Sequence, residues 1–326
     1  MVAVDSSASG ARRLTRVHVE ANDVVFESRG LRLAGTLTMP TGAGRFPAVL
    51  MIPGSGPLTR RTSRYVGDWL TAHGFVVFSY DKPGTGASGG RLGVLGHDDW
   101  SRDAVAALEV LARHPRVDVG RLGVMATSEG GFIAPRVARA DARVSFVLCR
   151  VCSALPHLEA ILDIEDDRLR RGGATDVERR DAMRFLRWRG EAALGARTPE
   201  AEAELERQLE GRSWRRHYQP SQLEVPPASA PYWAAFRSLL EGDPTSIYPE
   251  RTLRVHYLWG ADDARVRQPR HAEAIERLGA RLGGVSSRIL PCADHSLLSA
   301  CSASGIAGFA PEAHREILAW LKQAAR

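Results

Sequence analysis

The chain has 326 residues, of which 44% are hydrophobic and 25% are charged, and its formal net charge is +6 at pH 7. This length permits one large core or two smaller ones, so one domain with an insertion is the leading expectation. No stretch reaches the roughly 18 uncharged residues of a membrane-spanning helix, and residues 1–11 lack the apolar core of a secretory signal. We therefore expect a cytoplasmic protein that does not enter a membrane.

The positive charge comes almost entirely from arginine, since Lys82 and Lys322 are the only lysines. In residues 165–171 and 178–189 the arginines are interleaved with acidic residues, as on a solvated helix face. We therefore expect no nucleic-acid partner.

The chain contains four cysteines, Cys149, Cys152, Cys292 and Cys301. They are too few for a disulfide framework in a chain of this length, so we expect reduced thiols. The pair Cys149-x-x-Cys152 has a metal-like spacing, but it lies in an apolar run and no second ligand pair follows. We expect two buried thiols there and no metal.

Short apolar runs alternate with helix-like stretches along the first half of the chain. Residues 24–39 partly alternate between apolar and polar about Gly30, which predicts a β-hairpin. Unbroken apolar runs follow at 48–52, 75–79, 122–125 and 144–151, with helical patterns near 64–73, at 99–113 and after Ser128. Strands that are apolar on both faces and joined through helices predict a parallel sheet covered on both sides.

The alternation resumes near the C-terminus, with strands expected at 253–259 and 286–290 and helices at 270–282 and 312–324. The whole pattern predicts an α/β fold with a doubly wound, mostly parallel sheet. The intervening segment is charged, helix-like and longer than the roughly 30 residues that one crossover requires. We therefore expect a flexible N-terminal tail at 1–20, a core at 21–156 and 250–326, and a helical cap insertion at 157–249.

A serine stands where a predicted strand ends and a helix begins, within Ala126-Thr127-Ser128-Glu129-Gly130-Gly131. Such a bend, called a nucleophile elbow, lifts the serine hydroxyl clear of the sheet. The helix that follows directs backbone amides and a positive dipole end toward developing negative charge. A serine flanked by glycines is common by chance, so the interpretation depends on the residues that accompany it.

A serine hydroxyl needs a general base, and the base needs a carboxylate that orients it. The loop after the strand at 253–259 contains Asp262 and Asp263, and the loop after the strand at 286–290 contains His295. Both loops lie at the carboxyl ends of strands, and serine, acid, histidine is the chain order expected with such an elbow. The sequence therefore predicts catalytic roles for Ser128 and His295, with either aspartate as the acid.

An oxyanion in the transition state requires at least two hydrogen-bond donors. We assign one to the backbone amide of Glu129, which follows the serine. The other we assign to the amide of Ser55, in the loop at 53–57 after a strand. A tight turn with no role in catalysis would explain the glycines of that loop equally well.

A family resemblance rests on residues 33–40, 53–57, 80–88 and 127–131 and on the two loops with Asp263 and His295. In these segments the chain resembles the bacterial α/β-hydrolases related to dienelactone hydrolase and to the catalytic domain of prolyl-oligopeptidase-type peptidases. The pattern Gly-x-x-Asp-x-x-Val at 260–266 matches such relatives and favours Asp263 over Asp262. Relatives often have histidine at the position of Pro53 and Gly-His at the position of Ala126-Thr127.

The leading hypothesis is hydrolysis of an ester or thioester of a small acyl substrate through a Ser128 acyl-enzyme, without a cofactor. Tyr232, Trp233 and Phe236 of the expected cap are candidate walls of the acyl pocket, although aromatic residues at this spacing also form helix cores. One alternative passes the acyl group to another nucleophile, by transfer or cyclisation, with an acidic acyl carrier protein as a candidate partner. A second alternative, which Pro53 and Ala126 keep open, is a ligand-binding relative that does not catalyse.

Overall fold

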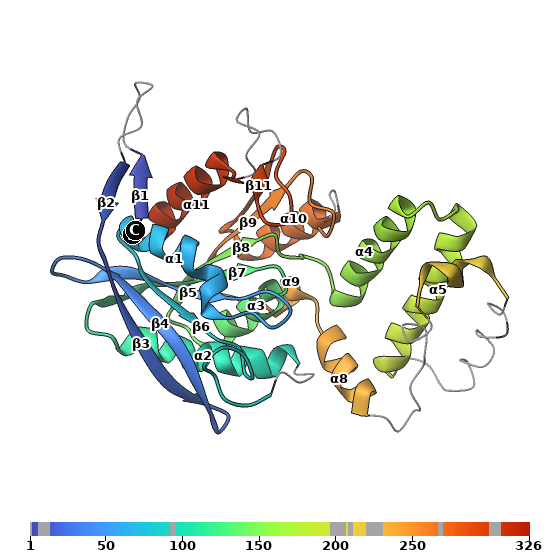
Figure 1. The fold of residues 1–326 in the computed structure, drawn as a ribbon, viewed down its shortest axis with the longest axis horizontal. Coiled ribbons are helices and arrows are strands. Elements are labelled where there is room, and N and C mark those ends of the chain that lie inside the picture. The colour runs from blue at the N-terminus through green and yellow to red at the C-terminus, as the bar shows by residue number, and fades with distance from the viewer. Residues whose placement is uncertain are drawn as a thin grey trace.

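The computed structural model describes residues 2–5, 14–91, 96–195, 207, 211–219, 231–266, 270–299 and 308–326. An eight-stranded sheet runs through the molecule (Figure 1). Its strands are β3 (Val19–Ser28), β4 (Leu31–Pro40), β5 (Phe46–Ile52), β6 (Val76–Tyr80), β7 (Val117–Thr127), β8 (Val144–Arg150), β9 (Arg254–Gly260) and β10 (Val285–Leu290). The spatial order is β10-β9-β8-β7-β5-β6-β4-β3.

The strands from β10 to β6 run parallel to one another, whereas β4 is antiparallel to β6. Strands β3 and β4 pair antiparallel through a two-residue turn at Arg29 and Gly30, and both turn residues have positive φ, 50° and 74°. Two positive φ values in succession are characteristic of the tight turns that suit the twist of a hairpin. The predicted hairpin and the predicted doubly wound sheet are both confirmed.

Helices cover both faces of this sheet. On one face lie α1 (Arg64–Ala72), which follows the short helix η1 (Arg60–Ser63), and α11 (Pro311–Ala324). On the other lie α2 (His97–Arg113), α3 (Gly130–Ala140) and α10 (Arg270–Leu282). Along β5, Ala48, Leu50 and Ile52 pack into one core, while Val49 and Met51 pack into the other. This burial on both faces explains why the strands read as unbroken apolar runs.

A helical segment joins β8 to β9 and extends away from the sheet (Figure 1). It contains α4 (His157–Arg171), α5 (Asp176–Ala193), η2 (Ser213–His217), α8 (Pro231–Leu240) and α9 (Pro244–Ile247). A small apolar cluster of its own includes Phe185, Trp188 and Trp214. The N-terminus of α5 is closed by a capping box, in which Thr175 and Glu178 satisfy each other's backbone amides. The helices predicted for this region are therefore present.

Two features differ from the sequence-based expectations. Strands β1 (Val2–Asp5) and β2 (Leu14–Val17) pair antiparallel within the segment for which we expected a flexible tail. Cys292 is disulfide-bonded, whereas Cys149 and Cys152 are free and buried. The expectation of reduced thiols is therefore wrong for Cys292, because a low cysteine count excludes a framework of bridges but not a single bridge.

The strands β11 (Leu298–Ser299) and β12 (Gly308–Phe309) form a further small antiparallel pair next to the loop that contains His295. Its connection to that loop is direct, because Ala293 bridges to Ser299. Among the described residues, no helix is long and apolar enough to cross a membrane.

Candidate active site

Ser128 lies at the sharp bend between β7 and α3. Its φ is 52°, a left-handed conformation that a non-glycine residue adopts only under local constraint. Its amide donates to the carbonyl of Arg150 at 3.0 Å, and its carbonyl accepts from Gly131 at 2.9 Å. A Cβ at Gly131 would lie 2.5 Å from the Cβ of Cys152, so only glycine lets α3 begin this close to the neighbouring strand end.

His295 lies between Ser128 and Asp263. Its Nε2 is 3.0 Å from the hydroxyl of Ser128, and its Nδ1 is 2.8 and 2.9 Å from the two carboxylate oxygens of Asp263. A carboxylate only accepts hydrogen bonds, so Nδ1 carries the proton and Nε2 is left to accept from the serine. The side chain of Asp263 is fully covered, with 0% exposure. The arrangement is that of a nucleophile, a base and an orienting acid.

The two aspartates of the acid loop have different surroundings. Asp263 also accepts hydrogen bonds from the backbone amides of Arg265 at 2.8 Å and Val266 at 3.1 Å, which fix its carboxylate. Asp262 is exposed, and its backbone amide donates to Ala293 at 2.9 Å. The geometry therefore joins Asp263, and not its neighbour, to the histidine.

The acid and histidine loops are packed directly against each other at the ends of β9 and β10. A Cβ placed at Gly260 would lie 2.0 Å from the carbonyl oxygen of Ala293. The amide of Ala261 donates to Leu290 at 2.8 Å across the same junction. This contact sets the position of the backbone two residues before His295.

The loop at 53–57 lies against the elbow. A Cβ at Gly54 would be 3.2 Å from the carbonyl of Thr127 and 3.3 Å from the Cβ of Ser128. Ser55 and Glu129 line one cavity together with Ser128 and His295. Neither the amide of Ser55 nor that of Glu129 donates to another group within the described ranges. The two residues therefore border the cavity next to Ser128, and their amides are not engaged by any other described group.

A buried lysine supports this loop from behind. Lys82 is 3% exposed, and its Nζ donates to the carbonyl of Gly54 at 2.6 Å. The same nitrogen is 3.5 Å from a carboxylate oxygen of Glu129 and 4.4 Å from the ring centre of Trp100. Burial lowers the pKa of Lys82 and raises the pKa of Glu129, while their mutual attraction opposes both shifts. Sequence reasoning missed this residue; its only signal was that it is one of two lysines in an arginine-rich chain.

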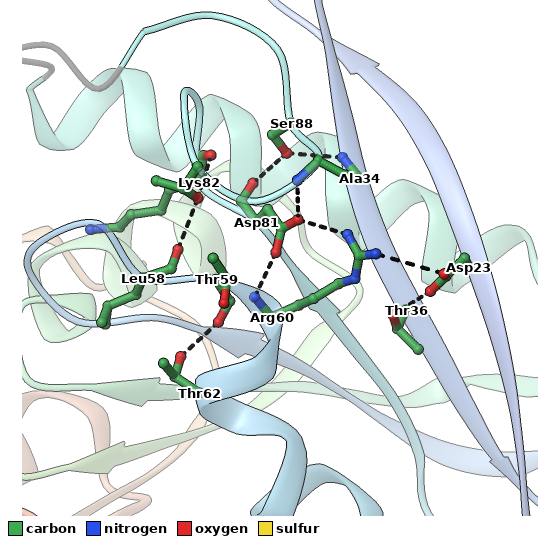
Figure 2. Close-up of polar contacts among 12 residues, drawn as sticks. Asp23, Ala34, Thr36, Leu58, Thr59, Arg60, Thr62, Asp81, Lys82 and Ser88 are labelled. Carbon is green, nitrogen blue, oxygen red and sulfur yellow. Dashed lines mark hydrogen bonds and ion pairs between the residues drawn. The ribbon is translucent and has the colours of Figure 1, made fainter.

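The loop that carries Lys82 is fixed by Asp81, which is 1% exposed. Its carboxylate accepts from the side chain of Arg60 at 2.6 Å and from the amides of Arg60 and Ala87 at 2.8 Å. Figure 2 shows Arg60 reaching from Asp81 toward Asp23, at 3.6 Å. A Cβ at Gly86 would lie 2.2 Å from the Asp81 carboxylate. Gly86 thus serves a structural turn that lets the backbone pass close to this carboxylate.

The cavity in front of Ser128 has a volume of about 130 Å³. Its apolar wall comes largely from α4 and α3, through Ala160, Ile161, Ile164 and Phe132. A dry cavity of roughly this size accommodates a benzene ring, so the space suits a short acyl or aryl group. His157 also lines it, and burial lowers the pKa of this histidine and favours the neutral ring.

The predicted aromatic wall is only partly within the described structure. Phe236 is half-buried, with the guanidinium of Arg189 5.8 Å from its ring centre, and it is not among the residues that line the cavity. The side chains of Tyr232 and Trp233 lie outside the described residues. The wall instead comes from α4, the helix directly after β8. Ligands of open α/β sheets bind at the carboxyl ends of the strands, so the position of α4 could have been predicted as a pocket wall.

The chain is similar in sequence to several known proteins. The family described as serine aminopeptidase, S33 (Hydrolase_4) matches residues 46–158, from β5 to the start of α4. The uncharacterized protein PA2218 of Pseudomonas aeruginosa is 31% identical over 134 residues, which are 40% of this chain and 36% of that protein. Esterase EstD of Thermotoga maritima is 23% identical over 290 residues, 83% of this chain and 61% of EstD. The chain thus spans less than two thirds of either relative.

Solved structures show the same fold. The crystal structure of PA2218 matches with a TM-score of 0.58 at 19% identity and covers 94% of both chains. The Pyrococcus furiosus esterase PF2001 matches with a TM-score of 0.58 at 15% identity, over 93% of this chain and 91% of that one. Together with the strand order, these matches show that the chain has the α/β-hydrolase fold.

Proposed function

We propose that this protein hydrolyses a small carboxylic ester or thioester through an acyl-enzyme formed on Ser128. The observation that carries the proposal is the chain of contacts from the hydroxyl of Ser128 to His295, 3.0 Å, and from His295 to Asp263, 2.8 Å. Ser128 and His295 line a cavity with an apolar wall. The coupling of a hydroxyl, an imidazole and a buried carboxylate is what nucleophilic catalysis by serine requires.

In the first half-reaction, Oγ of Ser128 attacks the acyl carbon while Nε2 of His295 takes the hydroxyl proton. The carbonyl oxygen becomes an oxyanion that accepts from the amides of Ser55 and Glu129. The tetrahedral intermediate then collapses, the bond to the leaving oxygen or sulfur breaks, and His295 returns its proton to that atom. The acyl group remains on Ser128 as an ester.

In the second half-reaction, water attacks the acyl carbon and gives one proton to His295. Collapse of this intermediate breaks the bond to Oγ, which regains the proton, and the carboxylic acid leaves. Throughout, Asp263 stays ionised and stabilises the imidazolium that forms twice per cycle.

Peptidase activity is the second candidate function, because the matching family is described as a serine aminopeptidase. An aminopeptidase must bind the charged amino group of its substrate, and Glu129 is the carboxylate that lines the cavity among the described residues. That carboxylate already faces Lys82 at 3.5 Å. A second cation beside this lysine is electrostatically unfavourable, so we favour an ester or thioester substrate.

Covalent labelling tests the proposal. We expect a fluorophosphonate to add one adduct mass to the wild-type protein, and none to Ser128→Ala, with the exposed Ser287→Ala as a matched control that labels normally. We expect the same pattern in the background-corrected hydrolysis of 4-nitrophenyl esters with acyl chains from acetyl to hexanoyl: wild type and Ser287→Ala are active, and Ser128→Ala is not. Equal turnover by wild type and Ser128→Ala would overturn the acyl-enzyme.

Hydrolysis and acyl transfer share this intermediate and differ in the group that accepts the acyl chain. Product analysis with an added alcohol, an amine or an acidic acyl carrier protein separates them. We expect the free acid as the main product, and a dominant transfer product would favour the acyltransferase or cyclase alternative instead. Absence of labelling in a folded protein would favour the ligand-binding alternative.

A further inference from the structure

We infer that the preferred substrate carries a second, anionic group, and that Arg265 binds it; this inference rests on the proposed function. Arg265 lies in the connection between β9 and α10, two residues after Asp263. Its side chain is exposed and lines the same cavity as Ser128 and His295. Its backbone amide is held by the carboxylate of Asp263 at 2.8 Å, so the residue starts from a fixed point beside the reacting groups.

The guanidinium of Arg265 makes no hydrogen bond or ion pair with any residue that the structure describes. Arg270, five residues further on, behaves differently, because it binds Asp163 at 2.6 Å and Glu159 at 2.9 Å. The arginine at the cavity is thus available, while Arg270, the first residue of α10, is neutralised by α4.

The other ionisable groups of the cavity leave no accessible negative charge for Arg265. Glu129 faces Lys82 at 3.5 Å, and Asp263 is fully covered behind His295. His157 is held neutral, because burial lowers its pKa. Among the residues that the structure describes, a ligand that enters the cavity therefore meets one unmatched, accessible cation.

The chemistry of the lining specifies the ligand further. A guanidinium binds a carboxylate or a phosphate through two parallel hydrogen bonds. The apolar residues of α4 face the same space, and its volume of about 130 Å³ limits the apolar part to a short chain or one ring. The substrate class is therefore a short amphipathic ester or thioester with an anion either in the acyl half or in the leaving half.

Paired substrates test this inference. For the acyl half, the pair is the 4-nitrophenyl monoester of adipate and 4-nitrophenyl hexanoate, which have six acyl carbons each. For the leaving half, the pair is 4-acetoxybenzoate and its methyl ester. We expect wild type to prefer the anionic member of one pair, and we expect Arg265→Gln to reduce that kcat/KM ratio about tenfold, as for the loss of one charge-assisted hydrogen bond. The neutral member should lose much less activity than the anionic member.

Arg277→Gln is the matched control. It removes one exposed arginine of α10 that does not line the cavity, so it should leave both ratios unchanged. An equal loss in Arg277→Gln would indicate a general effect of net charge, and an unchanged ratio in Arg265→Gln would overturn the inference.

A binding measurement separates this inference from the proposed function. Calorimetry with adipate and with 4-hydroxybenzoate on Ser128→Ala protein needs no turnover. We expect one of them to bind, and we expect Arg265→Gln in the same background to weaken its affinity about tenfold. Arginine-dependent binding without hydrolysis would reject the acyl-enzyme and keep the anion site. Hydrolysis of neutral esters with no arginine-dependent binding would reject the anion site and keep the acyl-enzyme.

Discussion

Lys82 and Gly54 are joined by a hydrogen bond of 2.6 Å, from a buried ammonium group to the carbonyl oxygen that precedes Ser55. This carbonyl and the N–H of Ser55 belong to one planar trans peptide group, in which they point in opposite directions. Holding the carbonyl therefore fixes the direction of the Ser55 amide, the proposed oxyanion donor. The turnover rate should depend on this lysine, although it lies behind the loop.

We predict that Lys82→Met lowers kcat for a neutral 4-nitrophenyl ester by roughly tenfold to a hundredfold with little change in KM. The reason is that an oxyanion donor contributes mainly in the transition state. Lys82→Arg should recover part of the loss if its longer side chain still reaches Gly54. A rise in KM at constant kcat would mean that the lysine shapes the substrate pocket instead.

The same substitution should also destabilise the protein. Without Lys82, Glu129 becomes a buried carboxylate without its cation, and removal of one member of a buried pair costs roughly 3–5 kcal/mol. We predict that Lys82→Met with Glu129→Gln is more stable in urea unfolding than Lys82→Met alone. If the second substitution adds to the destabilisation, the two side chains are not coupled in the way that their 3.5 Å separation indicates.

The two adjacent aspartates allow a sharp comparison. Asp263→Asn replaces the acceptor at Nδ1 of His295 with an amide and favours the wrong tautomer, which in the serine-protease triad costs about 10⁴ in kcat. Asp262→Asn changes the same charge on an exposed neighbour and should alter kcat/KM less than twofold. Circular dichroism first confirms that both variants are folded. Their steady-state rates then decide which aspartate orients His295. A large loss in Asp262→Asn alone would reverse the assignment.

Much of this architecture could be read from the sequence because its signals are local. The run at 48–52 is apolar on both faces because Ala48 and Val49 pack into different cores, and that pattern needs no knowledge of the partners. The serine, acid and histidine could be proposed together because each follows a strand, and parallel strands bring their carboxyl ends to one edge. The contacts of Ser128, His295 and Asp263 have the geometry that this argument leads one to expect.

The features that escaped prediction depend on contacts between distant segments. Lys82 contacts Gly54 and Glu129, which are 28 and 47 residues away in the sequence. The residues that flank Lys82 in the sequence do not indicate that its side chain is buried. The apolar wall of α4 was missed because the aromatic residues of the later helix give a stronger local signal. The strands β1 and β2 were missed because residues 1–17 lack the alternation that marks a strand.

Glycine at position 260 couples the fold to the proposed chemistry, so its substitution should damage both. Gly260→Ala places a Cβ 2.0 Å from the backbone of Ala293, which cannot move without displacing His295. We predict a loss of about 3 kcal/mol in unfolding free energy and a fall in kcat. Gly279→Ala is the control, because its Cβ meets only Val285 at 3.8 Å, and alanine should stabilise α10 by about 1 kcal/mol. Equal effects of the two variants would contradict the packing argument.

His256 in β9 should make the protein sensitive to mild acid. Burial, and secondarily the positive charge of Arg288, lowers its pKa to about 4, although Glu316 lies 3.5 Å from its Nε2. The reference pKa is 6.5, so between pH 6.5 and pH 4 the unfolded chain binds a proton at this residue that the folded chain does not. Stability therefore falls as the pH drops through this window, and below about pH 4 this residue adds no further slope.

His256→Phe isolates this contribution. Phenylalanine keeps an aromatic ring against Trp320, which stacks on the histidine at 5.3 Å, but it cannot titrate. It loses the 2.8 Å contact between Nδ1 and Ser286, which lowers stability by an amount independent of pH in this range. Urea unfolding at pH 8, 7, 6 and 5 should show a smaller decline between pH 7 and pH 5 in the variant than in wild type, and no difference in slope between pH 8 and pH 7. Parallel curves over the whole range would show that His256 titrates alike in the folded and unfolded chains, against the burial that the sheet imposes on it.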